Sequence, residues 1–148
     1  MRTVLAGLAL AVSAFPALAD DIVRVESARD VAATMDALQA AAEGAGATVF
    51  ARVDHGAGAR SVGSDIGDSQ LLIFGNPALG TPAIEADRLA GLYLPLKVLV
   101  FEDGDGKVWL AYEPPAETLD DLAIESDAEV LAKMAGALQA LTAAAAGG

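Results

Sequence analysis

The most strongly patterned stretch of the chain is residues 71–74, where four large apolar residues (Leu-Leu-Ile-Phe) follow one another. A strand with one solvated face would alternate apolar and polar side chains, so this run predicts a central strand that is covered on both faces. Gly75, Asn76 and Pro77 come next. Because Pro77 has no N–H and its two predecessors accept turn conformations, the strand should end there.

Four further segments are rich in β-branched and aromatic residues and are predicted to be strands: 22–25, 48–54, 96–101 and 107–112. The last two flank the Asp-Gly-Asp-Gly sequence of residues 103–106, a strong hairpin signal. This sequence resembles the start of a calcium loop, but Pro114 stands where an EF-hand needs Glu. We therefore predict a tight hairpin there. Trp109 and Tyr112 should lie on opposite faces of their strand, one in the core and one on an outer face that a ligand or a second subunit could cover.

Two amphipathic helices frame these strands. Ser27 is predicted to cap the first, with Asp30 in capping-box position, and Ser126 with Glu129 starts the last. Apolar residues fall on one face of the first helix at helical spacing: Val31, Met35, Leu38 and Ala42.

Shorter helical segments are expected between the strands. Thr81 and Pro82 should open one that Gly91 ends. Residues 57–62 could hold another. The order β-α-β-β-(short α)-β-β-α predicts an α+β domain, with one mainly antiparallel sheet and helices packed on one face.

The first nineteen residues have the features of a secretory signal peptide. Arg2 supplies a basic start, residues 4–12 are an apolar core too short to span a bilayer, and Ala17-Leu18-Ala19 fits the cleavage pattern. The alternative is a short buried N-terminal helix. We predict a signal peptide over residues 1–19, a single domain over residues 20–148, and a periplasmic or secreted location.

The composition limits the partners. The formal net charge is −12 and becomes −13 without Arg2, so neither nucleic acid nor an anionic membrane surface is an expected partner after signal cleavage. There is no cysteine. The exported domain must therefore be held together by its core, without disulfides, and has no cysteine nucleophile or thiolate metal ligand.

Several blocks of this sequence, taken in order, resemble a bacterial family known as domain of unknown function 302. They are Thr-Val-Phe-Ala-Arg-Val-Asp-His at 48–55, Leu-Ile-Phe-Gly-Asn-Pro at 72–77, Gly-Thr-Pro at 80–82, Leu-Pro-Leu at 94–96 and Trp-Leu-Ala-Tyr at 109–112. The resemblance covers about half of the chain and implies a TATA-binding-protein-like α+β fold. It implies neither DNA binding nor an established reaction, and no catalytic residue comes with it.

The one histidine, His55, ends a predicted strand beside Asp54. An imidazole oriented by a carboxylate can act as a general base or ligate a metal. It can equally be a strand-end residue that is exposed or bonded to the backbone. Asn76 ends another predicted strand, so we expect a small-molecule pocket near strand ends that gathers His55, Asn76 and Arg60.

Arg52 and Arg60 flank His55 in the sequence. Two arginines near one strand end could bind a small anion. The competing interpretation, which we favour, is that each pairs with a neighbouring surface carboxylate.

The sequence leaves three functions open. The first is an exported soluble domain that binds a small molecule or serves as an accessory protein. The second is a hydrolase or lyase that uses His55 as its base, although the sequence assigns no catalytic residue and we lean against an enzyme. The third is a structural homodimerising domain. No cofactor and no bound metal are expected.

Overall fold

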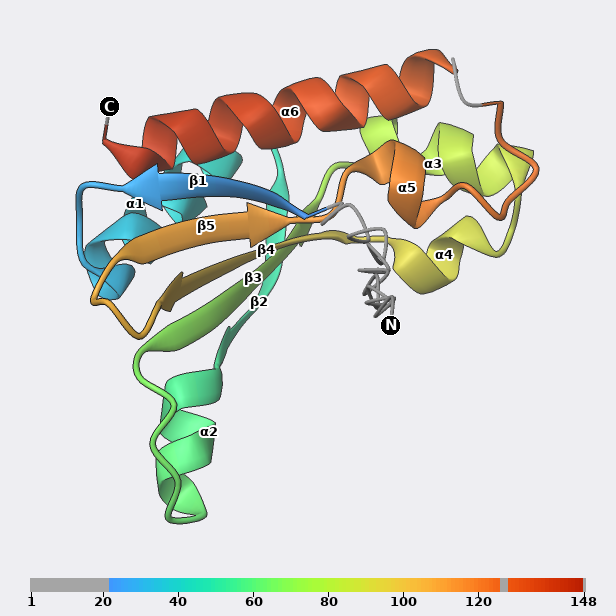
Figure 1. The fold of residues 1–148 in the computed structure, drawn as a ribbon. Helices are drawn as coiled ribbons and strands as arrows, with labels where there is room; N and C mark the ends of the chain where they lie inside the picture. Colours follow the sequence, from blue (N-terminus) through green and yellow to red (C-terminus); the bar gives the residue numbers. More distant parts are fainter. Residues whose placement is uncertain (1–21, 126–127, 148) are drawn as a thin grey trace, which may run out of the picture.

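The computed structural model describes residues 22–125 and 128–147. The predicted signal peptide and Ser126 lie outside these ranges. Five strands form one antiparallel sheet in the order β1-β5-β4-β3-β2 (Figure 1). Their bounds are Val23–Ser27 (β1), Thr48–Asp54 (β2), Ser69–Gly75 (β3), Leu96–Glu102 (β4) and Val108–Tyr112 (β5).

The two long helices, α1 and α6, lie together on one side of the sheet (Figure 1). This arrangement confirms the predicted α+β fold with helices packed on one face. The helices are Val31–Gly44 (α1), His55–Ser61 (α2), Pro77–Ala86 (α3), Ala90–Tyr93 (α4), Pro115–Thr118 (α5) and Glu129–Ala146 (α6).

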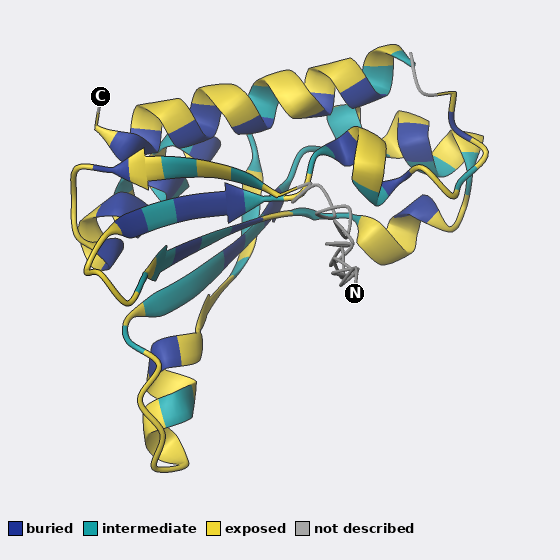
Figure 2. Cartoon of the chain, in the orientation of Figure 1, coloured by how far each residue is buried: buried dark blue, intermediate teal, exposed yellow. Residues whose placement is uncertain are grey.

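The main core lies between the sheet and these two helices. Alternate residues of the three inner strands point into it and are 0–6% exposed: Leu72, Phe74, Val98, Val100, Val108 and Leu110. They pack with Val31, Met35, Leu38 and Ala42 of α1, the four residues predicted from helical spacing, and with Leu138 and Leu141 of α6. Figure 2 shows buried residues, in dark blue, on the inner strands and on the side of α6 that faces the sheet.

The other side of the sheet, which we call the open face, has no comparable cover within residues 22–125 and 128–147. Its side chains are those that alternate with the core positions, and Leu71, Ile73, Leu99, Phe101 and Trp109 are only half-buried there. The prediction that residues 71–74 are covered on both faces is therefore wrong for this protomer. Trp109 lies on the open face and Tyr112 packs against the helix-side core, so these two aromatic residues do occupy opposite faces.

The first helix begins later than its sequence suggested. Asp30, not Ser27, is the N-cap of α1, and its Oδ1 accepts the Ala33 N–H at 2.7 Å. Ser27 is the buried last residue of β1, with its hydroxyl 2.7 Å from that of Thr34. Both Ser and Asp are good caps, and extending β1 to Ser27 leaves Asp30 at the turn.

The end of β3 is also the start of a helix. Asn76 caps α3 by accepting the Ala78 N–H at 2.9 Å, and Pro77 takes the first helical position. The predicted start at Thr81 and Pro82 is therefore wrong, since Pro82 lies inside α3. The pair Asn-Pro can form a turn, but it is also a favourable start for a helix, with Asn as the N-cap and Pro at the first helical position.

Residues 55–68, which we call the arm, project beyond the sheet on the side away from α6 (Figure 1). The helix α2 forms their first half and is capped by Asp54. The helix begins two residues before the predicted 57–62 segment because Asp54 is itself a good N-cap.

Candidate functional site

The structure separates the residues that were expected to form one pocket. In the β2–β3 pair, Asp54 lies opposite Gln70 and Thr48 lies opposite Gly75. His55 and Asn76 therefore stand beyond opposite ends of this hairpin, roughly 20 Å apart at the usual strand rise. The prediction of a single pocket that gathers both residues is therefore wrong. The sequence showed that each ends a strand, but not that the two strands are antiparallel neighbours.

His55 is exposed at the base of the arm. The neighbouring carboxylate caps α2, since Asp54 Oδ1 accepts the Ala57 N–H at 2.7 Å. A catalytic role for His55 remains a prediction without geometric support.

Both candidate arginines are paired with carboxylates. Arg52 donates from Nη1 to Asp36 of α1 at 2.5 Å and from Nε to Gln70 at 2.6 Å. Arg60 lies 3.4 Å from Asp68 within the arm. Their separate partners match the surface-pair interpretation and do not form a shared anion site.

Asn76 lies on the rim of a hollow of about 280 Å³. Its side chain serves the local fold, since Oδ1 caps α3 and Nδ2 donates to the Gly46 carbonyl at 3.4 Å. Four of the sequence blocks that carry the family resemblance meet around this hollow and contribute Phe50, Gly75–Pro77, Gly80–Thr81 and Leu94–Leu96.

A second hollow, of about 340 Å³, opens where two inner strands separate. The β4–β5 pairing runs from Glu102↔Val108 to Leu99↔Ala111. Beyond that pair, β4 continues to Leu96 beside β3, while Tyr112 of β5 pairs with β1. The two strand ends diverge, and we call the hollow between them the wedge pocket. Met134 and Leu138 of α6 also line it.

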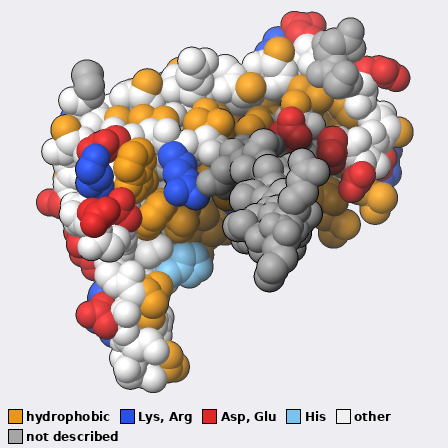
Figure 3. Space-filling model, viewed as in Figure 1, with side chains coloured by type: hydrophobic (Ala, Val, Ile, Leu, Met, Phe, Trp, Pro, Cys, Tyr) orange, Lys and Arg blue, Asp and Glu red, His pale blue; other side chains and the backbone are white. Residues whose placement is uncertain are grey.

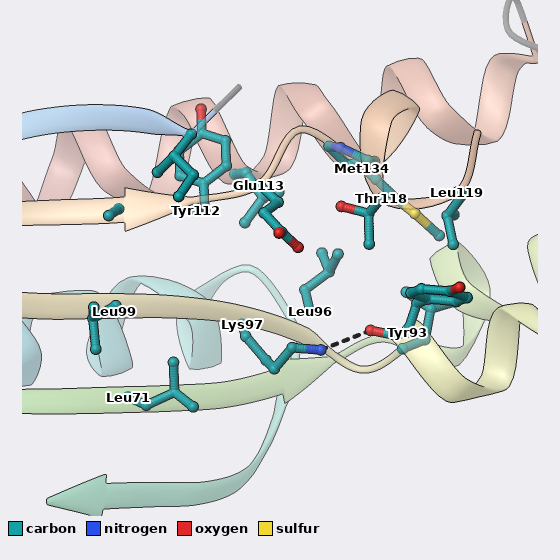
Figure 4. A pocket seen from close by; sticks show the side chains of 15 residues that line it. Leu71, Tyr93, Leu96, Lys97, Leu99, Tyr112, Glu113, Thr118, Leu119 and Met134 are labelled. Carbon is teal, nitrogen blue, oxygen red and sulfur yellow. Dashed lines mark hydrogen bonds between the residues drawn. The ribbon is translucent and has the colours of Figure 1, made fainter. Parts of the chain in front are cut away.

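Most of the wedge pocket is apolar, and its charged groups stand on two sides (Figure 4). Lys97 projects from the β4 side and Glu113 from the end of β5. The Lys97 ammonium donates to the Tyr93 carbonyl at 2.8 Å and to the Pro95 carbonyl at 3.4 Å. Within the described residues, Lys97 belongs to no ion pair. Its charge is therefore held in place by neutral acceptors and not balanced by a carboxylate.

Tyr112 reaches the wedge pocket from the core side. Burial raises the pKa of its phenol, partly offset by a hydrogen bond with Thr142. The group therefore stays protonated and neutral at physiological pH, as suits a wall made mainly of hydrocarbon.

The sequence analysis did not single out Lys97, although a signal was present. Within the run Leu-Lys-Val-Leu-Val-Phe at 96–101, it is the one polar residue of a strand that is otherwise apolar on both faces. A lone charge in such a strand indicates either an exposed end or a site.

The described residues contain neither a cluster of potential metal ligands nor a helix that could span a membrane. Over residues 22–125 and 128–147, three or more potential metal ligands of the His, Cys, Asp and Glu types do not come together. In the same ranges, no helix combines the length and apolarity that a membrane crossing needs.

Comparison with known proteins places this chain among relatives that are much longer. A protein of Brucella suis biovar 1 (strain 1330) named fluoride-specific ion channel FluC 1 is 43% identical over 117 residues, which cover 78% of this chain and 46% of that protein. The protein of the same name from Brucella abortus biovar 1 (strain 9-941) is also 43% identical over 117 residues, with 78% and 43% covered. The chain thus spans less than half the length of these curated relatives.

The fold has a solved counterpart. The crystal structure of an uncharacterized conserved protein DUF302 from Bacillus stearothermophilus superposes with a TM-score of 0.78 at 18% identity, covering 86% of this chain and 99% of that one. The observed element order is compatible with the TATA-binding-protein-like fold that the resemblance implied. The model of the family described as domain of unknown function DUF302 matches residues 23–141. The chain therefore belongs to the DUF302 family.

Proposed function

We propose that this protein is an exported binding domain whose wedge pocket holds a small, mainly apolar molecule with an anionic end group. The observation that carries the proposal is the pairing of an apolar hollow of about 340 Å³ with one cation, Lys97, that lacks a carboxylate partner. Pockets of this size and lining are typical of small-molecule sites.

The polar groups would set the orientation of the bound molecule. An anionic end beside Lys97 would gain a charge-assisted hydrogen bond. The hydrocarbon part would then lie against Leu71, Leu99 and Ala111. Each methylene removed from water there contributes about 0.8 kcal/mol, so a chain of several carbons supplies most of the affinity.

Octanoate is a suitable probe, with octanol and octylamine as matched ligands that differ only in the end group. Titration can be followed by the fluorescence of Trp109, the single tryptophan, which lies on the open face beside Ala111. We expect octanoate to bind more tightly than octylamine. In the Lys97→Met variant, which keeps an apolar stem, octanoate affinity should fall about tenfold while octanol affinity stays unchanged.

Lys133→Met is the matched control, because Lys133 lies on the outer side of α6 and pairs with Glu129. It should leave octanoate binding unchanged. Equal affinity of the wild type for the three probes, or equal octanoate affinity of Lys97→Met and the wild type, would contradict the proposal.

Export is the second part of the proposal and rests on the sequence of residues 1–19. N-terminal sequencing of the protein isolated from its own cells should begin near Asp20. Recovery of intact Met1 from the cytoplasmic fraction would contradict it. An accessory role beside a membrane protein is the wider form of the same idea, since the relatives named as ion channels contain a segment similar to this chain.

A further inference from the structure

Large apolar side chains are exposed in several places around the open face, while the outer surfaces of the long helices show none. Within the described residues, none of the large apolar side chains classed as exposed belongs to α1 or α6. They belong to the residue before β1, to β2, to the arm and to the region of α4: Ile22, Phe50, Val53, Val62, Ile66, Leu89, Leu92 and Tyr93. Figure 3 shows apolar surface beside the base of the arm. Such a concentration marks an interaction surface.

The strands continue this surface across the sheet. Phe50 lies at a bulge of β2, and a Cβ built on Gly75 would stand 3.5 Å from its ring on the open face. Leu71, Ile73, Leu99 and Phe101 extend the apolar area inward. An antiparallel sheet with one solvated face would carry polar residues at these positions.

Carboxylates are scarce on the open face. Although the chain has a net charge of −12, Glu26 is the one carboxylate among the open-face positions of the five described strands. It is paired with Lys107 at 3.1 Å. Arg24 and Lys97 also stand at open-face positions. Two copies of so acidic a protein would repel one another through most of their surface, but this face does not share that negative charge.

The arm buries almost nothing within its own protomer. From residue 55 to residue 68, Gly56 is the single buried residue. Val62 is 79% exposed and Ile66 is 55% exposed near the tip. A helix as short as α2 is marginal by itself, so the arm is expected to gain stability from contacts outside the protomer.

We propose that a second copy of this chain covers the open face in a two-fold dimer, with the arm of each protomer packed against its partner. One surface carries both the projecting part, the arm, and the sheet that can receive it, and an isologous dimer requires such self-complementarity. The eight exposed side chains present an apolar area on the order of 800 Å², about what each partner of a standard interface buries.

The test is the oligomeric state of the purified protein, measured by sedimentation velocity over a range of micromolar concentrations. The wild type should be a dimer. Val62→Glu in the arm and Leu92→Glu on α4 should each shift the protein to monomer, because each places a carboxylate in the apolar contact. Leu92 is 78% exposed, so neither change removes a core side chain.

Ala140→Glu is the matched control, since Ala140 is exposed on α6 and the change adds the same charge. This variant should remain a dimer, and circular dichroism should show all three variants folded. A monomeric wild type, or a dimer that persists in both Val62→Glu and Leu92→Glu, would overturn the proposal. Octanoate binding is measured in Val62→Glu, because Val62 does not line the wedge pocket, whereas Leu92 adjoins the pocket residue Tyr93. Octanoate binding by monomeric Val62→Glu would separate this result from the proposed function.

Discussion

The two faces of the sheet have similar sequences and different surroundings. On the helix side, Leu72 and Phe74 are at most 2% exposed and pack against α1 and α6. On the open face, their neighbours Leu71 and Ile73 are only half-buried. Four consecutive apolar residues of one strand therefore meet two environments within the protomer.

This difference shows what a hydrophobic pattern does and does not specify. The pattern reports that water is unfavourable on both sides of a strand, but it does not say whether the cover comes from the same chain. In this protein the helix side is covered by two long helices. The open face instead carries half-buried apolar side chains and contributes part of the wedge pocket, and both proposals above place interactions on this side.

The largest contrast should come from adjacent residues in β3. Phe74→Asp buries a carboxylate in the closed core and should abolish the cooperative thermal transition. Ile73→Asp puts the same charge on the open face and should leave a folded protein with a lower Tm. Thermal melts followed by circular dichroism compare the two variants. Similar melts for both would remove the distinction between the faces.

A second contrast concerns truncation of leucines. Leu38 is fully buried, so Leu38→Ala leaves a cavity in the core. The substitution should reduce the free energy of unfolding by about 2–5 kcal/mol. Leu71→Ala on the open face should cost about 1 kcal/mol, because its side chain already meets solvent in the monomer. Urea unfolding at a concentration where the protein is monomeric measures both values. A Leu71→Ala loss as large as that of Leu38→Ala would show that the open face is core.

The arm offers a matched pair of glycines in α2. A Cβ on Gly56 would lie 2.8 Å from the Gly67 carbonyl oxygen, so Gly56→Ala must displace the segment of the arm that contains Gly67. A Cβ on Gly58 meets nothing within 4 Å. We expect Gly56→Ala to speed amide exchange across the arm, and Gly58→Ala to stabilise α2 by about 0.5–1 kcal/mol. Hydrogen exchange measured by mass spectrometry compares the two variants. Equal exchange rates in the arm of both variants would contradict the close contact between Gly56 and Gly67.

The smallest expected effect concerns acid stability at the β4–β5 hairpin. The Trp109 indole N–H donates to Asp103 at 2.7 Å, and this bond, with the Lys107 backbone N–H, lowers the pKa of the carboxyl. A group whose pKa is lower in the folded state stabilises the fold above its unfolded value of 3.8 and loses that contribution as the pH falls through the folded value. Asp103→Asn should therefore reduce stability at pH 6 and flatten its decline below pH 4. An unchanged profile would show that the bond does not persist in solution.

Much of the fold could be predicted from local patterns, and the candidate site could not. The buried face of α1 and the hairpin at residues 103–106 follow from spacing and turn chemistry within a few residues. The wedge pocket depends on where β4 stops pairing with β5, which is a property of the assembled sheet. Asn76 illustrates the limit, because its strand-end position was recognised but its cap of α3 and its distance from His55 depend on strand order.

The pairing of the first strand with the last has a consequence for when the chain can fold. Within the sheet, β1 pairs with β5. The turn after β1 also contacts the end of α6: the Ala28 backbone N–H donates to the Ala146 carbonyl at 3.0 Å, and Arg29 Nη1 donates to the Ala145 carbonyl at 2.9 Å. A chain made from its N-terminus must therefore carry β1 without a sheet partner until Val108–Tyr112 has been synthesised. Such long-range closure slows folding. We expect the sheet to be completed only late in synthesis, and such a delay would suit the export proposed above.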